Sequence, residues 1–573
     1  MLPAEGRWRV ATTAVRFPGR GRGSPLMGRM GAAGAPTCVG DQQVGDGRGI
    51  PVDELTCDVL IVGGGMGGVA AALASSRMGQ RVVLTEEYDW LGGQLTTQAV
   101  PPDEHPWIER TGANLSYRQL RQAILDRYRN RPLVPRAAAD PHLNPGQCWV
   151  SALGCEPAEA AAAIDELLAE PVAAGTLRIL RRHVPRVVEV DDDRVRAVEL
   201  VDLRGGDPLT VTADYVLDAT EEGDLLPLAS CEYALGGDGR AATGEPDTTD
   251  EARADCQQAI TWCFALEHRP GEDHTIDRPE EYAFWSQFRA RFWPGPQLGW
   301  ATQEPETGQP LRRPLFGDGQ DLWTFRRIRY AGHYPAGWTT DVTVVNWPQV
   351  DYWLSPVVDV PSEQREEALL GSRALGRSFV YWLQTDAPRP DGGTGWPGLR
   401  LVPGVLGTPD GFAQRHYTRE PRRIRARTTV RQQDVGVLTD RAATRAPAVR
   451  DSVGVGSYRI DLHPSTCGRG YVDVPSWPFQ IPLGSLVPMR LRNLLAAGKC
   501  AGTTHVTNGC FRLHPVEWSI GEAAGALAAF SRRRAVEPAD VHADDELTAA
   551  FQRDLQTLGV QLSWPEEIAV QPR

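Results

Sequence analysis

The chain has 573 residues, 23% of them charged, and a formal net charge of −13. This length predicts roughly two to four domains, or one large domain with insertions. No segment approaches the ~18 apolar residues of a membrane helix, so we expect no membrane partner. The acidic balance argues against nucleic acid as a partner, because phosphate backbones require clustered cations.

The ten cysteines form no CxxC pair, which argues against a disulfide scaffold and against a zinc ribbon. We therefore expect free thiols, no metal site and a cytoplasmic protein. Of the 60 basic residues, only Lys499 is a lysine. Because arginine replaces lysine along the whole chain, we interpret this as a bias of genome composition.

The first 54 residues are predicted to be a disordered tail. The first 50 residues hold eleven Gly and seven Arg but few aliphatic side chains. They also lack the apolar core of a secretory signal.

Ordered structure is expected to begin abruptly at Cys57. Residues 58–62 are apolar and typical of a buried parallel strand, residues 67–78 are small and typical of a closely packed helix, and residues 81–86 predict a second strand. Together they predict a βαβ unit with a right-handed crossover.

The following residues predict two helices and more strands. The helices are expected at residues 117–129 and 157–170, a β-meander at 177–203 and a buried strand at 215–220. From residue 231 the character changes, because Pro and Gly become frequent and ten of the 17 Trp lie between Trp262 and Trp396. Trp in such a region more often forms a core than a ligand pocket.

These shifts predict an α/β protein in which a nucleotide-binding domain is interrupted by a β-rich substrate domain. Its expected parts are the first part of the nucleotide-binding domain (55–230), the inserted domain (231–451), a return segment (452–535) and a C-terminal helix (536–573).

A glycine fingerprint follows the first predicted strand. Gly63, Gly65 and Gly68 satisfy GxGxxG, in which the glycines allow a tight turn, close approach to a pyrophosphate and close packing of helix on sheet. Glu86 lies at the end of the second strand, where a carboxylate accepts hydrogen bonds from a ribose 2′-OH. The context predicts a dinucleotide site.

Later segments favour FAD over NAD. The LGGQ sequence that ends in Gly93 and Gln94 has a backbone able to follow an extended cofactor, and residues 494–498 and 521–525 form a second glycine-containing site. Two distant segments that converge on one dinucleotide suit FAD, the longer cofactor. Non-covalent attachment and covalent attachment through His105, Cys500 or Cys510 are both compatible with the sequence.

Several motifs together resemble the FAD-dependent oxidoreductase family, some of whose members carry xanthan-lyase-like labels. The motifs are GGGMGG at 63–68, LGG at 91–93, DATEEGD at 218–224, REPRRI at 419–424 with Asp434, SVGVGSYRIDLH at 452–463 and the region 496–525. The resemblance implies a glutathione-reductase-type, Rossmann-type FAD-binding domain (parallel sheet plus β-meander) with an inserted β-rich substrate domain. Pro421 departs from the small polar residue expected in that motif.

The resemblance also implies cofactor-binding roles. Gly63, Gly65 and Gly68 would hold the pyrophosphate, and Glu86 the adenosine ribose. Val184 would lie by the adenine, Ala219 would support the cofactor, and Gly93 with Gln94 would lie near the flavin. Gly498 and Gly521 would approach the ribityl chain and the pyrimidine end. The helix that starts at His514 would then direct its N-terminus at the flavin.

The candidates for proton transfer are histidines, whose pKa lies near neutrality. His105 follows the LGGQ loop, His463 ends a predicted strand, and His505 and His514 flank the return segment. Each of them is also explained by a structural role, but we expect at least one to act on substrate. Arg422 is a candidate clamp for a substrate carboxylate, and a structural ion pair is the alternative.

No second convincing dinucleotide fingerprint follows the first. We therefore expect an enzyme that oxidises a small molecule by hydride transfer to flavin N5, with electrons passing to oxygen or another acceptor. One alternative is an NAD(P)H-fed flavin monooxygenase. Another is a carbohydrate lyase or binding protein in which FAD is structural.

Overall fold

The computed structural model describes residues 53–568, apart from 305–306, 308, 318 and 438–442. The predicted tail therefore lies outside the described residues up to position 52. Asp53 and Glu54, assigned to that tail, begin β1 (Asp53–Val62) instead. This strand starts before the expected Cys57 because its first residues pair with β6 (Leu209–Asp218).

The main sheet has seven strands in the order β3-β2-β1-β6-β5-β4, with β23 (Leu494–Ala496) also paired to β6. The strands β2 (Val82–Glu86), β3 (Leu177–Arg181) and β23 join β1 and β6 in a parallel arrangement. Both β4 (His183–Asp191) and β5 (Arg194–Asp202) pair in antiparallel fashion. The α/β fold class with a parallel sheet and a meander is thus confirmed.

One strand of the predicted meander belongs elsewhere. The meander consists of β4, β5 and the first half of β6, whereas β3 is a parallel neighbour of β2. Polar and apolar residues alternate in β3 much as they do in β4, so the sequence pattern does not separate the two strands. The pairing of β3 with β2 assigns it to the parallel part of the sheet. An acidic turn at residues 191–193 joins β4 to β5, with Asp192 at φ +57°.

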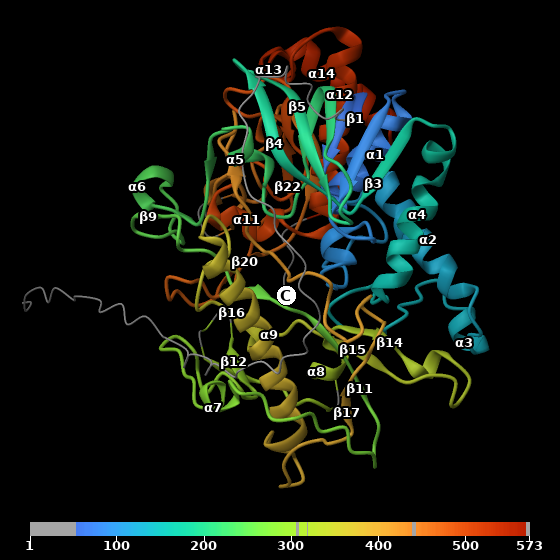
Figure 1. The fold of residues 1–573 in the computed structure, drawn as a ribbon, viewed down its shortest axis with the longest axis vertical. Helices are drawn as coiled ribbons and strands as arrows, with labels where there is room; N and C mark the ends of the chain where they lie inside the picture. The colour runs from blue at the N-terminus through green and yellow to red at the C-terminus, as the bar shows by residue number, and fades with distance from the viewer. Residues whose placement is uncertain (1–52, 305–306, 308, 318, 438–442, 569–573) are drawn as a thin grey trace, which may run out of the picture. The chain divides into compact units, whose positions relative to one another are not determined.

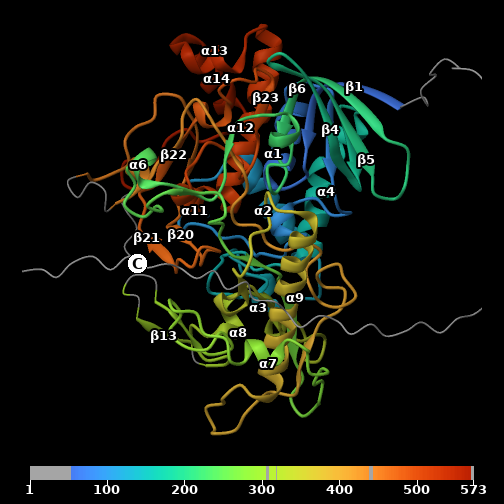
Figure 2. The ribbon, with the colours of Figure 1, turned by 60° about the vertical axis from the view of Figure 1, so that its left-hand side comes forward.

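Two helices pack against each other beside this sheet, as Figure 2 shows. They are α1 (Met66–Arg77) and α12 (His514–Arg534). Gly521 and Gly525 make this approach possible. A Cβ on Gly521 would lie 2.0 Å from the Gly67 carbonyl oxygen, and one on Gly525 would lie 2.3 Å from the Ala71 oxygen. The preceding α11 (His505–Phe511) and the later α13 (Pro538–Ala543) and α14 (Asp545–Thr557) complete the C-terminal part.

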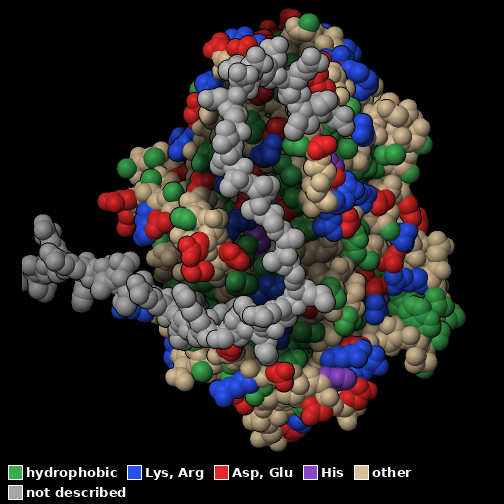
Figure 3. All heavy atoms as spheres, in the orientation of Figure 1, with side chains coloured by type: hydrophobic (Ala, Val, Ile, Leu, Met, Phe, Trp, Pro, Cys, Tyr) green, Lys and Arg blue, Asp and Glu red, His purple; other side chains and the backbone are tan. Residues whose placement is uncertain are grey.

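The other two predicted helices are present as α2 (Leu115–Arg129) and α4 (Pro157–Ala173). Among the described residues no helix is both long and apolar enough to cross a membrane. Figure 3 shows acidic and basic side chains interspersed over one face of the molecule.

The Trp-rich region contains a four-stranded antiparallel sheet in the order β14-β15-β11-β17. Its strands are β14 (Arg327–Arg329), β15 (Val342–Val345), β11 (Phe264–His268) and β17 (Leu399–Leu401). A long helix, α9 (Ser362–Thr385), packs against β17 (Figure 1). The sequence analysis predicted a β-rich region and did not predict α9. The helix has a sequence signal, because apolar residues recur at helical spacing and are buried: Ala368, Leu375, Phe379 and Leu383.

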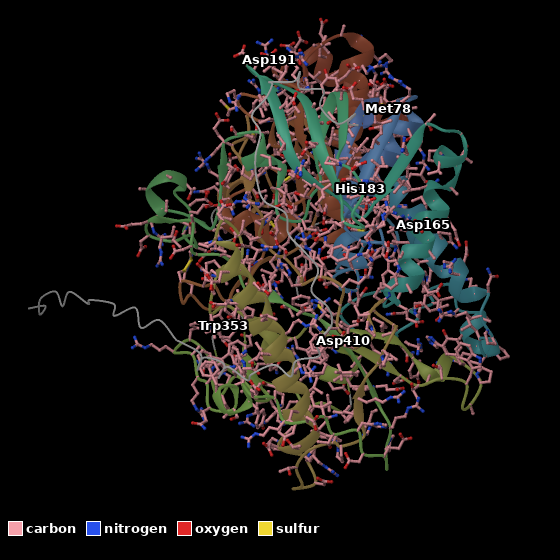
Figure 4. The ribbon with its side chains drawn as sticks, viewed as in Figure 1. Met78, Asp165, His183, Asp191, Trp353 and Asp410 are labelled. Carbon is pink, nitrogen blue, oxygen red and sulfur yellow. A yellow bond between two sulfur atoms is a disulfide. The ribbon has the colours of Figure 1, made fainter. Side chains whose placement is uncertain are left out.

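Most tryptophans of this region are core residues. Trp285 and Trp347 are among the largest fully buried side chains, and Trp353 (Figure 4) packs against Trp293. The preference for a core over a ligand pocket therefore holds at these positions.

One cysteine prediction is wrong. Cys256 and Cys467 form a disulfide, so not every thiol is free as expected. The two cysteines are 211 residues apart and do not form a recognisable motif, which is why the sequence did not reveal the pair. The seven other described cysteines are free and buried.

Candidate functional site

A tight turn joins β1 to α1. Gly63 has φ +101°, and a Cβ there would lie 2.3 Å from the Ala219 carbonyl oxygen, so only glycine fits. Gly65 is the N-cap of α1, and no side chain caps the helix at that residue. Gly68 packs back on the turn, since a Cβ on it would meet the Gly63 oxygen at 1.9 Å. The turn thus leaves the start of α1 open to a ligand.

A cavity of about 460 Å³, which we call the α1 cavity, lies beside this turn. It is large enough for part of a cofactor. Six of the predicted cofactor residues line it, namely Gly63, Gly65, Glu86, Gly93, Val184 and Ala219. They come from four separate segments. His183, labelled in Figure 4, begins β4 and also lines the cavity.

Glu86 is a buried carboxyl at the end of β2. Its Oε2 accepts a hydrogen bond from the Gly64 N–H at 3.0 Å, and its Oε1 accepts one from the Tyr88 N–H at 2.9 Å. Burial raises the pKa of Glu86 to about 8. The carboxyl is fixed in orientation and faces the cavity.

Arginines from the Trp-rich half of the chain form one wall of the cavity. Arg415 is buried and pairs with Glu87 and Glu222. Arg365, from the first turn of α9, pairs with Glu222 at 2.8 Å. The cavity is thus bounded by both halves of the chain.

Arg422 also lines the cavity, but its guanidinium is already ion-paired. It lies 3.1 Å from Asp224 and 2.7 Å from Asp359. The structure thus places it in the structural ion pair that was the alternative to a carboxylate clamp. Arg423, on the opposite face of the strand, is fully buried against Glu420 and Asp238.

A second group of side chains, which we call the polar centre, consists of Gln94, Glu221, Lys499 and Glu517. Lys499 donates to Glu221 at 2.5 Å, and Gln94 donates to Glu517 at 2.5 Å. A Cβ on Gly93 would lie 2.0 Å from Glu221 Oε1. The polar centre therefore adjoins the glycines of the α1 cavity.

Gly498 lies beside the same group, since a Cβ on it would be 3.4 Å from Glu517 Oε1. Gly521 faces Gly67 of α1, so the close packing of the two helices by itself accounts for a glycine there.

Two of the four candidate histidines have structural surroundings. His105 lies against Trp107 and Trp564, and its Nε2 is 3.1 Å from the Gly112 oxygen. His514 accepts the Asp103 N–H and contacts the Val100 oxygen, so both ring nitrogens are used by backbone groups. Burial lowers the pKa of each to about 4, and both are neutral at physiological pH.

The other two histidines each pair with a carboxylate. His463 Nδ1 lies 2.6 Å from Asp351, and His505 Nδ1 lies 2.9 Å from both Glu420 oxygens. Gln258 joins the two pairs, because its N–H donates to Glu420 and its Oε1 accepts from the His463 N–H. Around the His463 pair lie Arg419, Asp461, Tyr471 and Arg512, and we call the whole group the histidine network.

The segment from Tyr417 to Glu420 links the two groups. The Thr418 carbonyl accepts from Lys499 at 2.9 Å, and its N–H donates to Gln98. Its neighbours Arg419 and Glu420 are members of the histidine network. Lys499, Glu517 and Arg415 were not predicted as site residues from the sequence, although Lys499 stands out as the single lysine of the chain.

The residues present fit a dinucleotide with a polar head group. Gln94 is fully buried and its Nε2 has two acceptors, while its Oε1 has no partner among the described residues. The glycines leave no room for Cβ atoms at the turn, and Glu86 presents a fixed carboxyl. Such a backbone cradle with unpartnered polar groups suits a ligand rich in donors and acceptors.

A family model described as FAD dependent oxidoreductase matches residues 58–555. The chain belongs to this family. FAD is accordingly its cofactor, and the protein is an oxidoreductase. A search of curated proteins gave no match.

Solved structures to which the chain is similar include a quinol fumarate reductase from E. coli (12% identity, 88% of this chain and 74% of that chain, TM-score 0.31). Another is a geranylgeranyl bacteriochlorophyll reductase-like protein from Thermoplasma acidophilum (11% identity, 88% of this chain and 84% of that chain, TM-score 0.31). The flavin-dependent monooxygenase PieE, in complex with FAD and substrate, is 18% identical over 57% of this chain (TM-score 0.25). The match spans only 47% of PieE and 27% of an L-proline dehydrogenase from P.horikoshii.

Proposed function

We propose that this oxidoreductase oxidises a small molecule at a C–H bond next to nitrogen or oxygen, with electrons passing on to oxygen or another acceptor. The observation that carries the proposal is the pairing of His505 with Glu420, which is two residues along the chain from Thr418, whose carbonyl contacts Lys499 of the polar centre. An oriented histidine beside the cofactor site is what proton removal requires.

The cofactor, when bound, supplies a two-electron acceptor at flavin N5. Gly63, Gly65 and Glu86 would hold its nucleotide half, and Gly93, Gln94 and Gly498 would lie towards its flavin half. The hydrogen of the substrate C–H bond leaves with both bonding electrons.

His505 takes the accompanying proton from the substrate N–H or O–H. Glu420 holds Nδ1 of the ring, which leaves Nε2 as the nitrogen for proton transfer. Burial raises the pKa of Glu420, but its contacts with His505 and Arg423 outweigh this and hold the pKa below its ordinary value. Glu420 therefore remains ionised and accepts the hydrogen bond from Nδ1 of the ring. His463, paired with Asp351, is the second candidate for this role.

The test is anaerobic mixing of the FAD-loaded protein with candidate amines, amino acids and alcohols, followed by the loss of visible flavin absorption. We expect His505→Asn to slow reduction by about 10²- to 10⁴-fold, the range of general base catalysis. His463→Asn is the matched variant on the other carboxylate–histidine pair, and the visible spectrum checks that each variant retains FAD.

Three results would contradict the proposal. Reduction by His505→Asn at the wild-type rate would remove His505 from the reaction. Steady-state consumption of NADH would favour the flavin monooxygenase. Photoreduced flavin that no acceptor reoxidises would favour structural FAD in a carbohydrate lyase or binding protein.

A further inference from the structure

Lys499 is unusual both in composition and in position. It is the one lysine among 60 basic residues, so arginine occupies every other basic position of the chain. Its side chain has 0% exposure. A compact ammonium with a flexible stem fits where a planar guanidinium with five donors does not. The position thus calls for a small, buried point charge.

The surroundings of Lys499 are acidic. Its ammonium donates to Glu221 at 2.5 Å and to the Thr418 oxygen at 2.9 Å. Burial lowers the pKa of Lys499, but the carboxylates of Glu221 and Glu517 outweigh this and raise the pKa above its ordinary value. Lys499 is therefore charged at neutral pH, and the acceptors found among the described residues use two of its three N–H groups.

These carboxylates lie where α1 begins. A Cβ on Gly65 would be 2.7 Å from Glu221 Oε1 and 3.5 Å from Glu517 Oε1. Glu517 also lies in the first turn of α12. The positive ends of both helices, expected to favour an anionic cofactor, thus face buried acids. Without a cation, this region would repel negative charge.

Burial raises the pKa of Glu517 to about 7, with a further contribution from Glu221. The polar centre therefore carries between zero and one net negative charge near neutrality. Removal of Lys499 makes it more negative by at most one charge, because Lys499 also lowers the pKa of Glu517. In a water-excluded site such a change is poorly screened.

We propose that Lys499 offsets the negative charge of the polar centre, so that bound FAD, which gains negative charge on reduction, has a higher reduction potential. This inference rests on the proposed placement of FAD in the α1 cavity. It makes Lys499 a residue that tunes the cofactor, and it predicts opposite effects when either member of the Lys499–Glu221 pair is neutralised.

The experiment measures the reduction potential of bound FAD by equilibration with redox dyes, and the affinity for sulfite, which adds to oxidised flavin and leaves negative charge on the ring. We expect Lys499→Met to lower the potential and to weaken sulfite binding by about tenfold or more. Glu221→Gln should raise the potential and tighten sulfite binding. The double variant Lys499→Met/Glu221→Gln should lie close to wild type.

Arg196→Met is the matched control, because Arg196 forms an exposed ion pair with Asp191 and its loss should change neither quantity. If Lys499→Met fails to fold or to hold FAD, Glu221→Gln still tests the proposal with the opposite sign. Unchanged potential and sulfite affinity in FAD-loaded Lys499→Met or Glu221→Gln would overturn it.

The two proposals fail separately. If the potentials shift as expected but no substrate reduces the flavin, the role of Lys499 stands and the proposed oxidation fails. If a substrate reduces the flavin but the potentials are unchanged, the proposed oxidation stands and the role of Lys499 fails.

Discussion

At the turn between β1 and α1, three consecutive glycines present backbone to the α1 cavity, whereas the histidine network consists of side chains. Gly63, Gly64 and Gly65 follow one another in the chain, and their conformation is set by one strand and one helix. In the network, Asp351 contacts His463 and Glu420 contacts His505 across 112 and 85 residues. A local motif therefore builds the turn, and long-range folding builds the histidine network.

This difference predicts different responses to substitution. A Cβ added at Gly63 meets the backbone of Ala219 and Thr220, which cannot move without disturbing the sheet. Atoms changed in the histidine network alter charge and hydrogen bonding within a packed but side-chain-rich cluster.

The largest effect is expected for Gly63→Ala. The new Cβ would lie 2.3 Å from the Ala219 oxygen at a residue with φ +101°, so strain and overlap add. We expect a loss of about 3 kcal/mol or more in the free energy of unfolding, together with loss of FAD. Chemical denaturation and the visible spectrum measure both.

Gly79→Ala separates these two causes. Gly79 has φ +81° but nothing within 4 Å of an added Cβ. Gly79→Ala should lower the free energy of unfolding by about 1 kcal/mol, the cost of a left-handed alanine. Equal losses at the two positions would show that the turn has no special packing against Ala219.

What could be predicted from the sequence follows the same division between local motif and long-range contact. The strand–turn–helix was predictable because residues 58–86 carry its signals locally, and the family was predictable because its motifs are short and continuous in the chain. The partners of His463 and His505 were not, since nothing in the sequence near either residue indicates Asp351 or Glu420. His514 was a candidate because it lies at the start of a helix, but backbone groups contact both of its ring nitrogens.

A smaller, pH-dependent effect is expected at Glu86. Its pKa is raised from 4.5 to about 8 by burial, so the folded protein holds a proton that the unfolded chain releases. The resulting stability is present below pH 4.5 and is lost as the pH rises towards 8. In the cofactor-free protein, Glu86→Gln should remove roughly 2 kcal/mol of the decline between pH 5.5 and 7.5.

Thermal unfolding of both proteins across this pH range gives the comparison. Asp218, whose pKa burial raises to about 7, contributes in the same direction in both proteins and cancels in the difference. Parallel curves for wild type and Glu86→Gln would mean that Glu86 is ionised in the folded protein.

The smallest effect on the reaction is expected at His514, although it begins the helix once assigned to the flavin. Its pKa is lowered from 6.5 to about 4 by burial, so the folded protein keeps it neutral while the unfolded chain takes up a proton. The stability it contributes is complete above pH 6.5 and is lost as the pH falls towards 4. His514→Gln should reduce this acid sensitivity and lower stability by about 1 kcal/mol, the value of a lost hydrogen bond.

The decisive measurement at His514 is the pH profile of flavin reduction, because a structural histidine changes stability without changing that profile. His505→Asn should alter the profile, since it removes the proton acceptor that Glu420 orients. If His514→Gln instead shifted the profile and His505→Asn did not, the proton acceptor would lie at the start of α12. The histidine network would then be structural support for the cofactor site.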